Sequence, residues 1–158
     1  MLSERGDYTI RHGGPSDVPV VFDLGRRTVD DGLSSLRNAP ASNAAAAFDR
    51  SVNFALSEPH TLLIAEAGGE RLGFMLGLDD APDDATGTPQ LFCVYVAVEA
   101  YARRRGIARA FFDVAEKAAQ AAGVRYLSLV VSEENLAARS LYAHLGFLTE
   151  RRILCKVL

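Results

Sequence analysis

The amino-acid sequence predicts an α/β fold, built as a single domain over residues 1–158. The length of 158 residues suits one ordinary domain, and a hydrophobic fraction of 49% is enough to form a core. Apolar residues recur at every second position in some stretches and at helical spacing in others, which predicts both strands and helices. The run LFCVYVAV, residues 91–98, is nearly all apolar and is typical of a central strand covered on both faces. The predicted order of elements is β-α-α-β-β-β-α-β-α-β.

The first half of the chain predicts a strand, a pair of helices and a hairpin. Residues 7–13 alternate as a short strand, and residues 60–78 form two strands joined at Gly68 and Gly69. Helices are expected between them because apolar residues there recur at helical spacing. Each of these helices is preceded by side chains that can cap it: Ser16 or Asp17 for the first, Ser42 or Asn43 for the second.

The second half begins with the central strand at residues 91–98 and continues with two helices. The first helix starts at Gly106 and ends at Gly123, a favourable residue just past a helix end. A strand follows at residues 125–131, and the second helix runs from a cap at Ser132 to Gly146. The remaining segment, FLTERRILCKVL, alternates well enough to predict a closing strand.

Composition excludes several classes of protein. A net charge of −3 and a pI of about 5.6 argue against a general nucleic-acid binder, which would present a basic surface. The two cysteines, Cys93 and Cys155, lie in apolar surroundings without a CxxC or Cys/His cluster, so neither a metal site nor a disulfide is indicated. No apolar run reaches the roughly 18 residues that span a bilayer, and the first residues lack a signal-peptide core. The expected location is cytoplasmic, with no membrane partner.

Positive charge gathers where the helix at Gly106 begins. Three consecutive arginines, Arg103 to Arg105, precede this glycine, and Arg109 follows it. The first backbone N–H groups of a helix have no internal partner and attract anions, so a phosphate group could be held here. Gly106 would let the backbone approach the ligand, and the small side chain of Ala108 keeps the approach open. The competing interpretation is a solvated basic surface.

Two motifs resemble those of the GCN5-related N-acetyltransferase (GNAT) superfamily. Arg103-Arg-Arg-Gly106-Ile-Ala108 resembles its R/Q-x-x-G-x-G/A signature, which grips the pyrophosphate of acetyl-coenzyme A. The residues ARAFF that follow depart from the small-x-Leu-Leu form usual in the family. Downstream, Asn135 through Phe147 matches the family's N-x-x-A-x-x-x-Y-x-x-x-G-F run at every position. The spacing of Asn135, Ala138 and Tyr142 would place all three on one helix face.

The resemblance implies a mixed, mostly antiparallel central sheet flanked by helices, and an acetyl-CoA-dependent N-acetyltransferase. Such an enzyme transfers the acetyl group to a primary amine of a small molecule or peptide by direct attack in a ternary complex. By the same resemblance, Tyr142 protonates the departing thiolate. The residues expected to bind acetyl-CoA are Val96, Ala97, Val98, Arg103, Arg104, Arg105, Gly106, Ile107, Ala108, Arg109, Asn135 and Ala138.

The acceptor side carries no comparable motif. In the family it is built by the first two helices and the loop after the third strand, here residues 16–57 and 79–89. Both regions contain acidic runs, which favour a cationic amine. A water chain can serve as the general base, and the candidate side chains are Glu66, Asp79, Asp80 and Glu99.

Other functions stay open at this point. One is a catalytically degenerate, acyl-CoA-binding regulatory module, although retention of Tyr142 and of the complete glycine motif speaks against it. A nucleic-acid patch formed by the arginines is disfavoured by the acidic balance of the chain. An acetyltransferase of the GNAT type could also transfer a longer acyl chain, or transfer the acyl group to oxygen. A homodimer could form if the closing strand paired across a two-fold axis; the sequence decides neither this nor the identity of the amine.

Overall fold

A computed structural model describes residues 3–5 and 7–158, with the first three of these as backbone only. Within the described residues, six strands form one sheet in the order β1-β2-β3-β4-β5-β6. Neighbouring strands are antiparallel except for β5 and β6, which are parallel. This confirms the mixed, mostly antiparallel sheet. The strands are β1 (Ser3–Arg5), β2 (Tyr8–His12), β3 (His60–Ala67), β4 (Glu70–Pro82), β5 (Pro89–Val98) and β6 (Leu127–Leu129).

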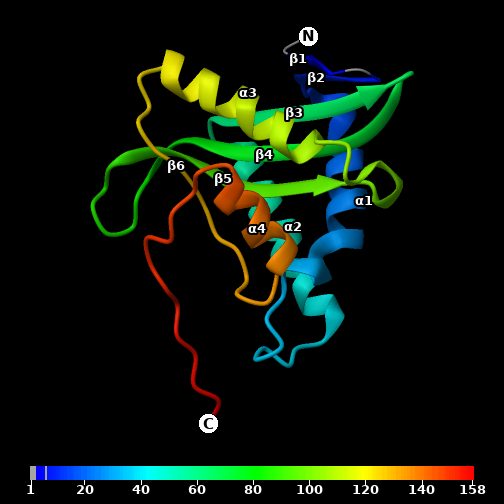
Figure 1. The fold of residues 1–158 in the computed structure, drawn as a ribbon. Helices are drawn as coiled ribbons and strands as arrows, with labels where there is room; N and C mark the ends of the chain where they lie inside the picture. Colours follow the sequence, from blue (N-terminus) through cyan, green and yellow to red (C-terminus); the bar gives the residue numbers. More distant parts are fainter. Residues whose placement is uncertain (1–2, 6) are drawn as a thin grey trace.

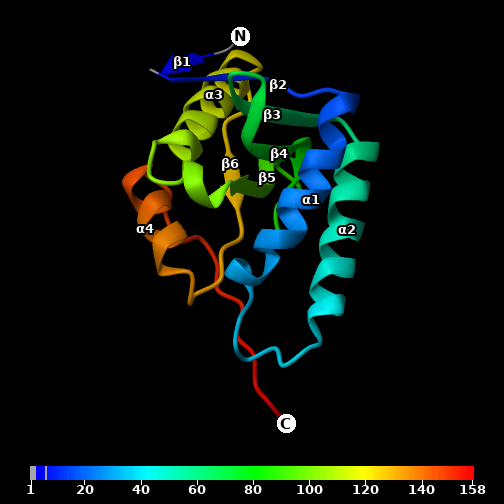
Figure 2. The ribbon, with the colours of Figure 1, turned by 90° about the vertical axis from the view of Figure 1, so that its right-hand side faces the viewer.

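Helices cover both faces of the sheet. Helices α1 (Val18–Thr28) and α2 (Ala41–Ser57) lie on one face, and α3 (Ile107–Ala121) and α4 (Leu136–His144) lie on the other, as Figures 1 and 2 show from two directions. Short 3-10 turns extend the chain at three places: η1 (Pro15–Asp17), η2 (Val29–Gly32) and η3 (Ala100–Ala102). The short strand β1 was not predicted, whereas from β2 to α4 the order of helices and strands agrees with the prediction.

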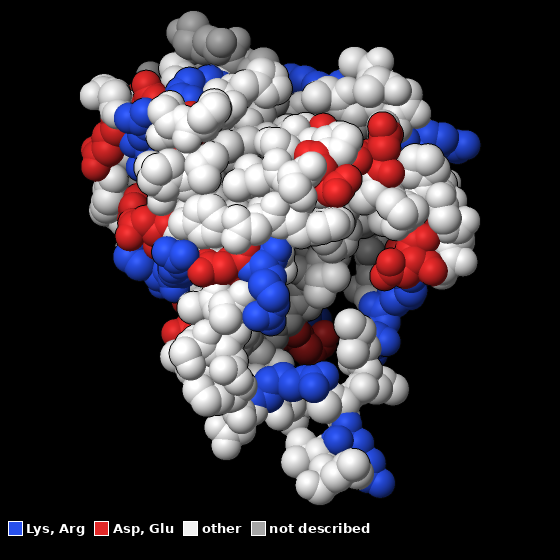
Figure 3. All heavy atoms as spheres, turned by 180° about the vertical axis from the view of Figure 1, so that it is seen from behind, with Lys and Arg blue, Asp and Glu red and all other residues white. Residues whose placement is uncertain are grey.

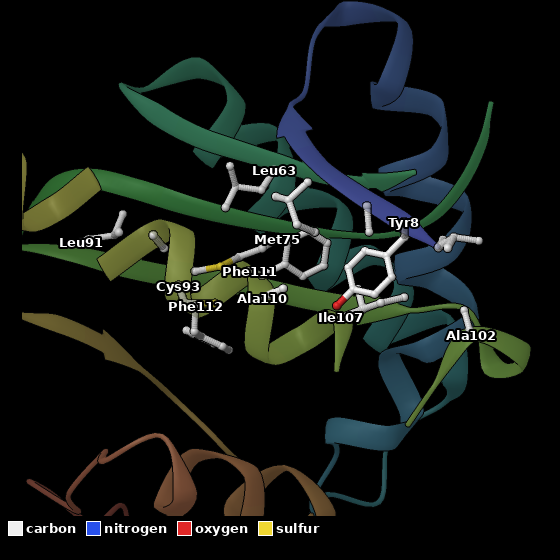
Figure 4. Packing of buried hydrophobic residues seen from close by; sticks show 14 of the residues in the cluster. Tyr8, Leu63, Met75, Leu91, Cys93, Ala102, Ile107, Ala110, Phe111 and Phe112 are labelled. Carbon is white, nitrogen blue, oxygen red and sulfur yellow. The ribbon is translucent and has the colours of Figure 1, made fainter. Parts of the chain in front are cut away.

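Each pair of helices encloses its own apolar core. On the α1–α2 face, the ring of Phe48 packs 4.8 Å from that of Tyr95 and fills the space beside Gly25, where a Cβ would come within 1.9 Å of the ring. On the opposite face, the fully buried rings of Phe111 and Phe112 anchor α3 against the sheet (Figure 4). The sheet is therefore covered on both faces at its centre, as the apolar run in β5 predicts.

Strand β5 contains a bulge that changes which way its residues face. Leu76 on β4 pairs with Tyr95, but the next residue, Gly77, pairs with Cys93, so Val94 is an extra residue in the ladder. Before the bulge, Cys93 packs in the core under α3; after it, Tyr95 packs in the core under α1 and α2. Such a bulge bends the strand and increases its twist. The parallel pairing with β6 ends at the same place, at Cys93 and Leu129.

Several predicted boundaries are wrong. Helix α4 begins at Leu136 instead of after Ser132, because the side chain of Asn135 caps it. Asp17 is the N-cap residue of α1, one of the two residues predicted for that place, whereas Pro40 takes this position in α2; neither helix has a side-chain hydrogen bond at its cap. Asp79 and Asp80 lie inside β4, which extends to Pro82, instead of following the strand. The predicted closing strand is absent from the described chain: residues 148–158 have no regular secondary structure.

Candidate active site

One edge of β5 is open where β5 and β6 separate, and the space beside this edge is called the groove below. Beyond Cys93, no strand of the described chain pairs with β5 on the side away from β4. The N–H of Glu99 donates to the carbonyl of Leu72 on β4 at 2.8 Å, which sets the alternation of the antiparallel ladder. Peptide groups alternate in direction along a strand, so those of Ala97, two residues before Glu99, also point toward β4. Those of Val96 and Val98 point the other way, into the groove. The Val98 carbonyl accordingly accepts a hydrogen bond from Arg103 Nε at 3.2 Å on that side.

The groove leads to the first turn of α3. Gly106 is the N-cap of this helix and has a φ of 81°, a left-handed conformation that glycine adopts without strain. The first bond into the helix is from the N–H of Ala110 to the carbonyl of Gly106, at 2.9 Å. No hydrogen bond within the described chain uses the N–H groups of residues 104–109. Arg104 also has a positive φ, of 66°, so the loop is curled ahead of the helix. These free amides and the helix dipole make the turn suited to an anion.

The arginines of this turn are exposed and point in different directions. Arg103 reaches across to η2, where its guanidinium binds the carboxylate of Asp31 at 3.1 Å. Arg105 binds the carboxylate of Asp7 at the start of β2. Arg104 and Arg109 are exposed. The side chain of Ala108 is half-buried and that of Ile107 is buried, where Ile107 packs beside the ring of Tyr8 (Figure 4). The apolar positions of the motif thus fix α3 to the sheet, while its arginines face solvent and neighbouring acids.

Tyr142 stands on α4 against the aromatic residues of α3. Its ring lies edge-on to Phe112 at 5.6 Å and to Phe147 at 5.7 Å, in the core that also contains Cys93. Phe112 belongs to the aromatic pair that departs from the usual family motif, and here it forms the wall behind the tyrosine. Burial raises the pKa of the Tyr142 phenol well above its ordinary value near 10, and the neighbouring Cys93 contributes to this. The phenol therefore stays protonated at neutral pH and can donate a hydrogen bond.

Cys93 is poorly suited to act as a nucleophile. It is a free, buried thiol, and burial raises its pKa to about 12. The thiolate is the reactive form of cysteine, and burial disfavours that form here.

Asn135 has a structural function in α4. Its side-chain oxygen accepts a hydrogen bond from the N–H of Ala138 at 3.1 Å, so the residue caps the helix and does not form part of it. The side-chain NH2 group is left to interact outside the helix. Asn135, Ala138 and Tyr142 are all half-buried.

The four carboxylates considered as bases lie in different places. Glu66 is bound by Arg11 at 2.7 Å on the outer part of the sheet, and Asp79 accepts a hydrogen bond from Thr61 at 2.8 Å. Asp80 is exposed. Glu99 directly follows β5, where it is paired with Arg27 of α1 at 2.7 Å. Of these four, Glu99 is the one beside the open edge of β5.

Two contacts at the mouth of the groove were missed by sequence reasoning. The carboxylate of Glu134, in the loop before α4, accepts hydrogen bonds from the N–H of Ser35 at 3.1 Å and from its hydroxyl at 2.9 Å. The ion pair between Asp31 and Arg103 lies in the same region. Both contacts tie the segment between α1 and α2 to the opposite face of the sheet. The partners are more than 70 residues apart in sequence, so no local pattern could reveal them.

The described residues contain no group of three or more His, Cys, Asp or Glu side chains that could hold a metal ion. Nor does any helix in the described ranges have the length and apolar character to cross a membrane.

Comparison with known proteins places this architecture in a family. Residues 33–147 match the model of the acetyltransferase (GNAT) family. A protein of Pyrococcus furiosus assigned as an acetyl transferase superposes with a TM-score of 0.80 at 21% identity, covering 96% of this chain and 99% of that one. The aminoglycoside N-acetyltransferase AAC(6')-Iy, solved with CoA, gives 0.69 at 19% identity and covers 99% of each chain.

A third similar structure is the aminoglycoside antibiotic 6'-N-acetyltransferase AAC(6')-IG of Acinetobacter haemolyticus. Its TM-score is 0.68 at 16% identity, with 95% of this chain and 97% of that chain covered. At these identities the likeness is one of fold. No match was found among curated proteins. Because the family model covers most of the chain, including both motifs, the chain belongs to the GNAT family of acetyltransferases.

Proposed function

We propose that the protein transfers an acetyl group from acetyl-CoA to a primary amine of a small molecule or peptide, by direct attack while both substrates are bound. The observation that carries this proposal is the continuity of the groove. The free edge of β5 leads directly to the unpaired amides at the start of α3. Such a line of donors suits a long polar arm that ends in a diphosphate.

The residues present fit acetyl-CoA. The N–H groups of Arg105, Gly106, Ile107, Ala108 and Arg109 would bind the diphosphate, since the helix dipole adds partial positive charge there. Gly106 has no side chain to obstruct the approach. Arg103, Arg104 and Arg109 would add charge-assisted hydrogen bonds once the ligand competes with solvent and with Asp31. Along β5, the peptide groups of Val96 and Val98 would bind the pantetheine arm, while Ala97 forms the wall beneath it.

Bound acetyl-CoA would supply a thioester carbonyl for attack by the amine. Backbone N–H groups at the open edge of β5 would polarise that carbonyl, because preorganised donors stabilise developing negative charge. Tyr142 would donate its phenolic proton to the departing sulfur, a role that its raised pKa permits. Glu99, or water that it orders, would take the proton from the amine. Asn135 and Ala138 would line the wall between these groups.

We propose a cationic acceptor, such as a polyamine, an aminoglycoside or a peptide N-terminus. Asp30 and Asp31 on η2 are exposed beside the groove, and negative charge at its mouth would attract an ammonium group. Aminoglycoside N-acetyltransferases among the similar structures support the same class. A cytoplasmic homodimer is also part of this proposal.

The test is substitution of Tyr142→Phe, which keeps the ring packed on Phe112 and Phe147. We expect kcat to fall by roughly 100-fold, the usual loss for one general acid, with little change in the Kd of acetyl-CoA. Thiol release with a panel of amines measures the first quantity, and calorimetry the second. The matched control is Tyr101→Phe, because Tyr101 is exposed and bonds Glu70 away from the groove.

Equal kcat values for the wild type and Tyr142→Phe would eliminate the phenol as the acid. Binding of acetyl-CoA by the wild type without turnover of any amine would instead favour the regulatory module.

A further inference from the structure

The segment between α1 and α2, residues 29–37, lies between the two proposed substrate sites. Figure 2 shows it at the lower ends of both helices, and η2 at its start packs against α1 and α2. It carries two exposed carboxylates, Asp30 and Asp31, which belong to the acceptor side of the proposed function. Asp31 is already engaged by an arginine that belongs to the acetyl-CoA side.

That arginine is Arg103, which lies three residues before Gly106. Its guanidinium binds the carboxylate of Asp31 at 3.1 Å, and its Nε donates to the carbonyl of Val98 at 3.2 Å. Because this carbonyl faces the groove, the guanidinium lies in the space that the pantetheine arm would occupy. The side chains of Arg103 and Asp31 are 48% and 61% exposed, so solvent screens the ion pair and it is weak.

The Asp31 carboxylate belongs to the α1–α2 face of the sheet. Tyr95 packs in the core of that face. Burial raises the pKa of Tyr95, and the negative charges of Asp31 and Asp30 add to this rise, so both carboxylates lie close enough to act on its hydroxyl. Helix α3 packs on the opposite face, in the core that also contains Tyr142. Arg103 therefore connects an acid on one face of the sheet with the anion-binding turn on the other.

The segment is also held in place without Arg103. The N–H of Ser35 donates to both carboxylate oxygens of Glu134 at 3.1 Å, and the Ser35 hydroxyl donates to one of them at 2.9 Å. The N–H of Leu33 donates to the carbonyl of Asp30 at 3.3 Å and closes η2. Separation of Arg103 from Asp31 would therefore free the carboxylate without requiring the segment to move.

Acidic and basic side chains on this side of the molecule lie next to one another. Figure 3 shows them interleaved on the side of α1, which is at the left in that view. Arg27 binds both Asp23, at 2.9 Å, and Glu99, at 2.7 Å. Among the hydrogen bonds of the described residues, Asp31 takes part in one, with Arg103. If Arg103 had another anion to bind, Asp31 would be the carboxylate left for an ammonium group.

We propose that Asp31 binds the ammonium group of the acceptor, and that it competes with the diphosphate of acetyl-CoA for Arg103. A diphosphate carries more negative charge than one carboxylate and is also bound by the amides of the turn, so it prevails. When Arg103 turns to the diphosphate, the Val98 carbonyl is free for the pantetheine arm and Asp31 for the amine. Each substrate thus favours binding of the other. This inference rests on the proposed function and adds the residue that couples its two sites.

Calorimetry with coenzyme A, which binds without reacting, tests the competition. Asp31→Asn should tighten the Kd of coenzyme A by roughly two- to five-fold, the range expected for loss of an exposed ion pair. Asp30→Asn is the matched control, because it removes the same charge one position away, whereas Arg103 binds Asp31. Its Kd should stay close to that of the wild type, since solvent and salt screen unpaired surface charges.

A double substitution shows whether the effect depends on Arg103. Arg103→Gln removes the guanidinium, so adding Asp31→Asn to it should no longer tighten the binding of coenzyme A. Two residues that act through one contact are non-additive in this way. The side chains of both residues are exposed, so the variants should keep the Tm of the wild type.

The acceptor side is tested with one compound of each proposed class: spermidine, an aminoglycoside and a tripeptide amide with a free N-terminus. With the best of the three, Asp31→Asn should raise KM several-fold and change kcat less, because Asp31 binds the amine and takes no proton from it. Asp30→Asn should change KM less than Asp31→Asn does.

An unchanged or weaker affinity for coenzyme A in Asp31→Asn would overturn the competition. So would an equal gain in Asp30→Asn, or a gain that persists in the Arg103→Gln background. An unchanged KM for the amine would remove Asp31 from the acceptor site. A wild-type protein that binds coenzyme A but fails these comparisons loses this inference alone, whereas one that neither binds coenzyme A nor turns over any amine loses the proposed function itself.

Discussion

The left-handed backbone conformation of Gly106 shapes the first turn of α3. Its φ of 81° suits glycine, and the amides around it have no partner in the described chain. The sequence predicts this residue because glycine before an apolar helix is a local pattern. It does not predict that Arg103 binds Asp31, since that contact depends on how η2 lies in three dimensions. Local patterns thus indicate candidate residues for the site, whereas the contacts that these residues make depend on the fold.

Replacing Gly106 with Ala should weaken acetyl-CoA binding several-fold. A Cβ has room there, its nearest neighbour being the Tyr8 hydroxyl at 3.8 Å, so the cost is conformational, about 1 kcal/mol of unfolding free energy. Calorimetry measures the Kd. The control is Gly123→Ala at the other end of the same helix, where φ is 75° and nothing lies within 4 Å. Both variants should lose similar stability; a similar loss of affinity in both would mean that Gly106 has no special relation to the ligand.

Helix α4 shows how one element can carry both a cap and a candidate acid. The motif from Asn135 to Phe147 predicted the helix and its tyrosine, but placed Asn135 within it. The structure makes Asn135 the cap, because its side-chain oxygen competes successfully for the N–H of Ala138. Sequence spacing gives the periodicity of a helix well and its ends poorly, since the ends depend on a few hydrogen bonds.

Substitutions of Asn135 separate its two functions. Asn135→Ala should lower the free energy of unfolding by about 1 kcal/mol through loss of the cap. Asn135→Asp retains a capping oxygen and so should keep the stability, yet it lacks the NH2 donor, and we expect weaker acetyl-CoA binding. Urea denaturation and calorimetry measure the two effects. If Asn135→Asp binds acetyl-CoA with wild-type affinity, Asn135 serves only as the cap of α4.

The architecture of the whole molecule was largely predictable because the strands and helices have clear periodicities. The open end of the sheet was not. Residues 147–158 have a strand pattern, yet they form no strand in the structure, because an alternating pattern does not show which strand edge would supply the hydrogen bonds. The bulge at Val94 was also beyond prediction, because a nearly all-apolar strand gives no signal of which side each residue faces.

Acid should destabilise the protein through Asp17. This carboxylate is buried and hydrogen-bonded first by Arg11 and then by the N–H of Gly14 and by Arg71, which holds its pKa well below the ordinary value of 3.8. A carboxyl group whose pKa is lower in the folded than in the unfolded state stabilises the fold at pH values above its unfolded-state pKa. This stabilisation is lost as the pH falls toward its folded-state pKa. We expect a loss on the order of 2 kcal/mol as pH drops from about 5 to about 2.

In Asp17→Asn the loss of unfolding free energy on acidification should be smaller than in the wild type. The free energy of unfolding at neutral pH should also be lower, because Arg11 loses a buried partner. Urea denaturation across this pH range measures both. Asp23→Asn is the control, since Asp23 is 70% exposed in its pair with Arg27 and should leave the profile unchanged. An identical pH profile in wild type and Asp17→Asn would assign acid sensitivity to other groups.

The extra residue in β5 has a consequence for how the family's sequences can vary. Peptide groups in a strand point alternately to its two sides, so many side chains can be replaced, but inserting or deleting one residue reverses the direction of the groups that follow. Val94 lies outside this alternation, so its loss would leave the pairs on either side in register. Adding or removing one residue between Tyr95 and Val98 would instead turn the peptide groups that now face the groove toward β4. The length of this short stretch should therefore be constrained far more strictly than its composition.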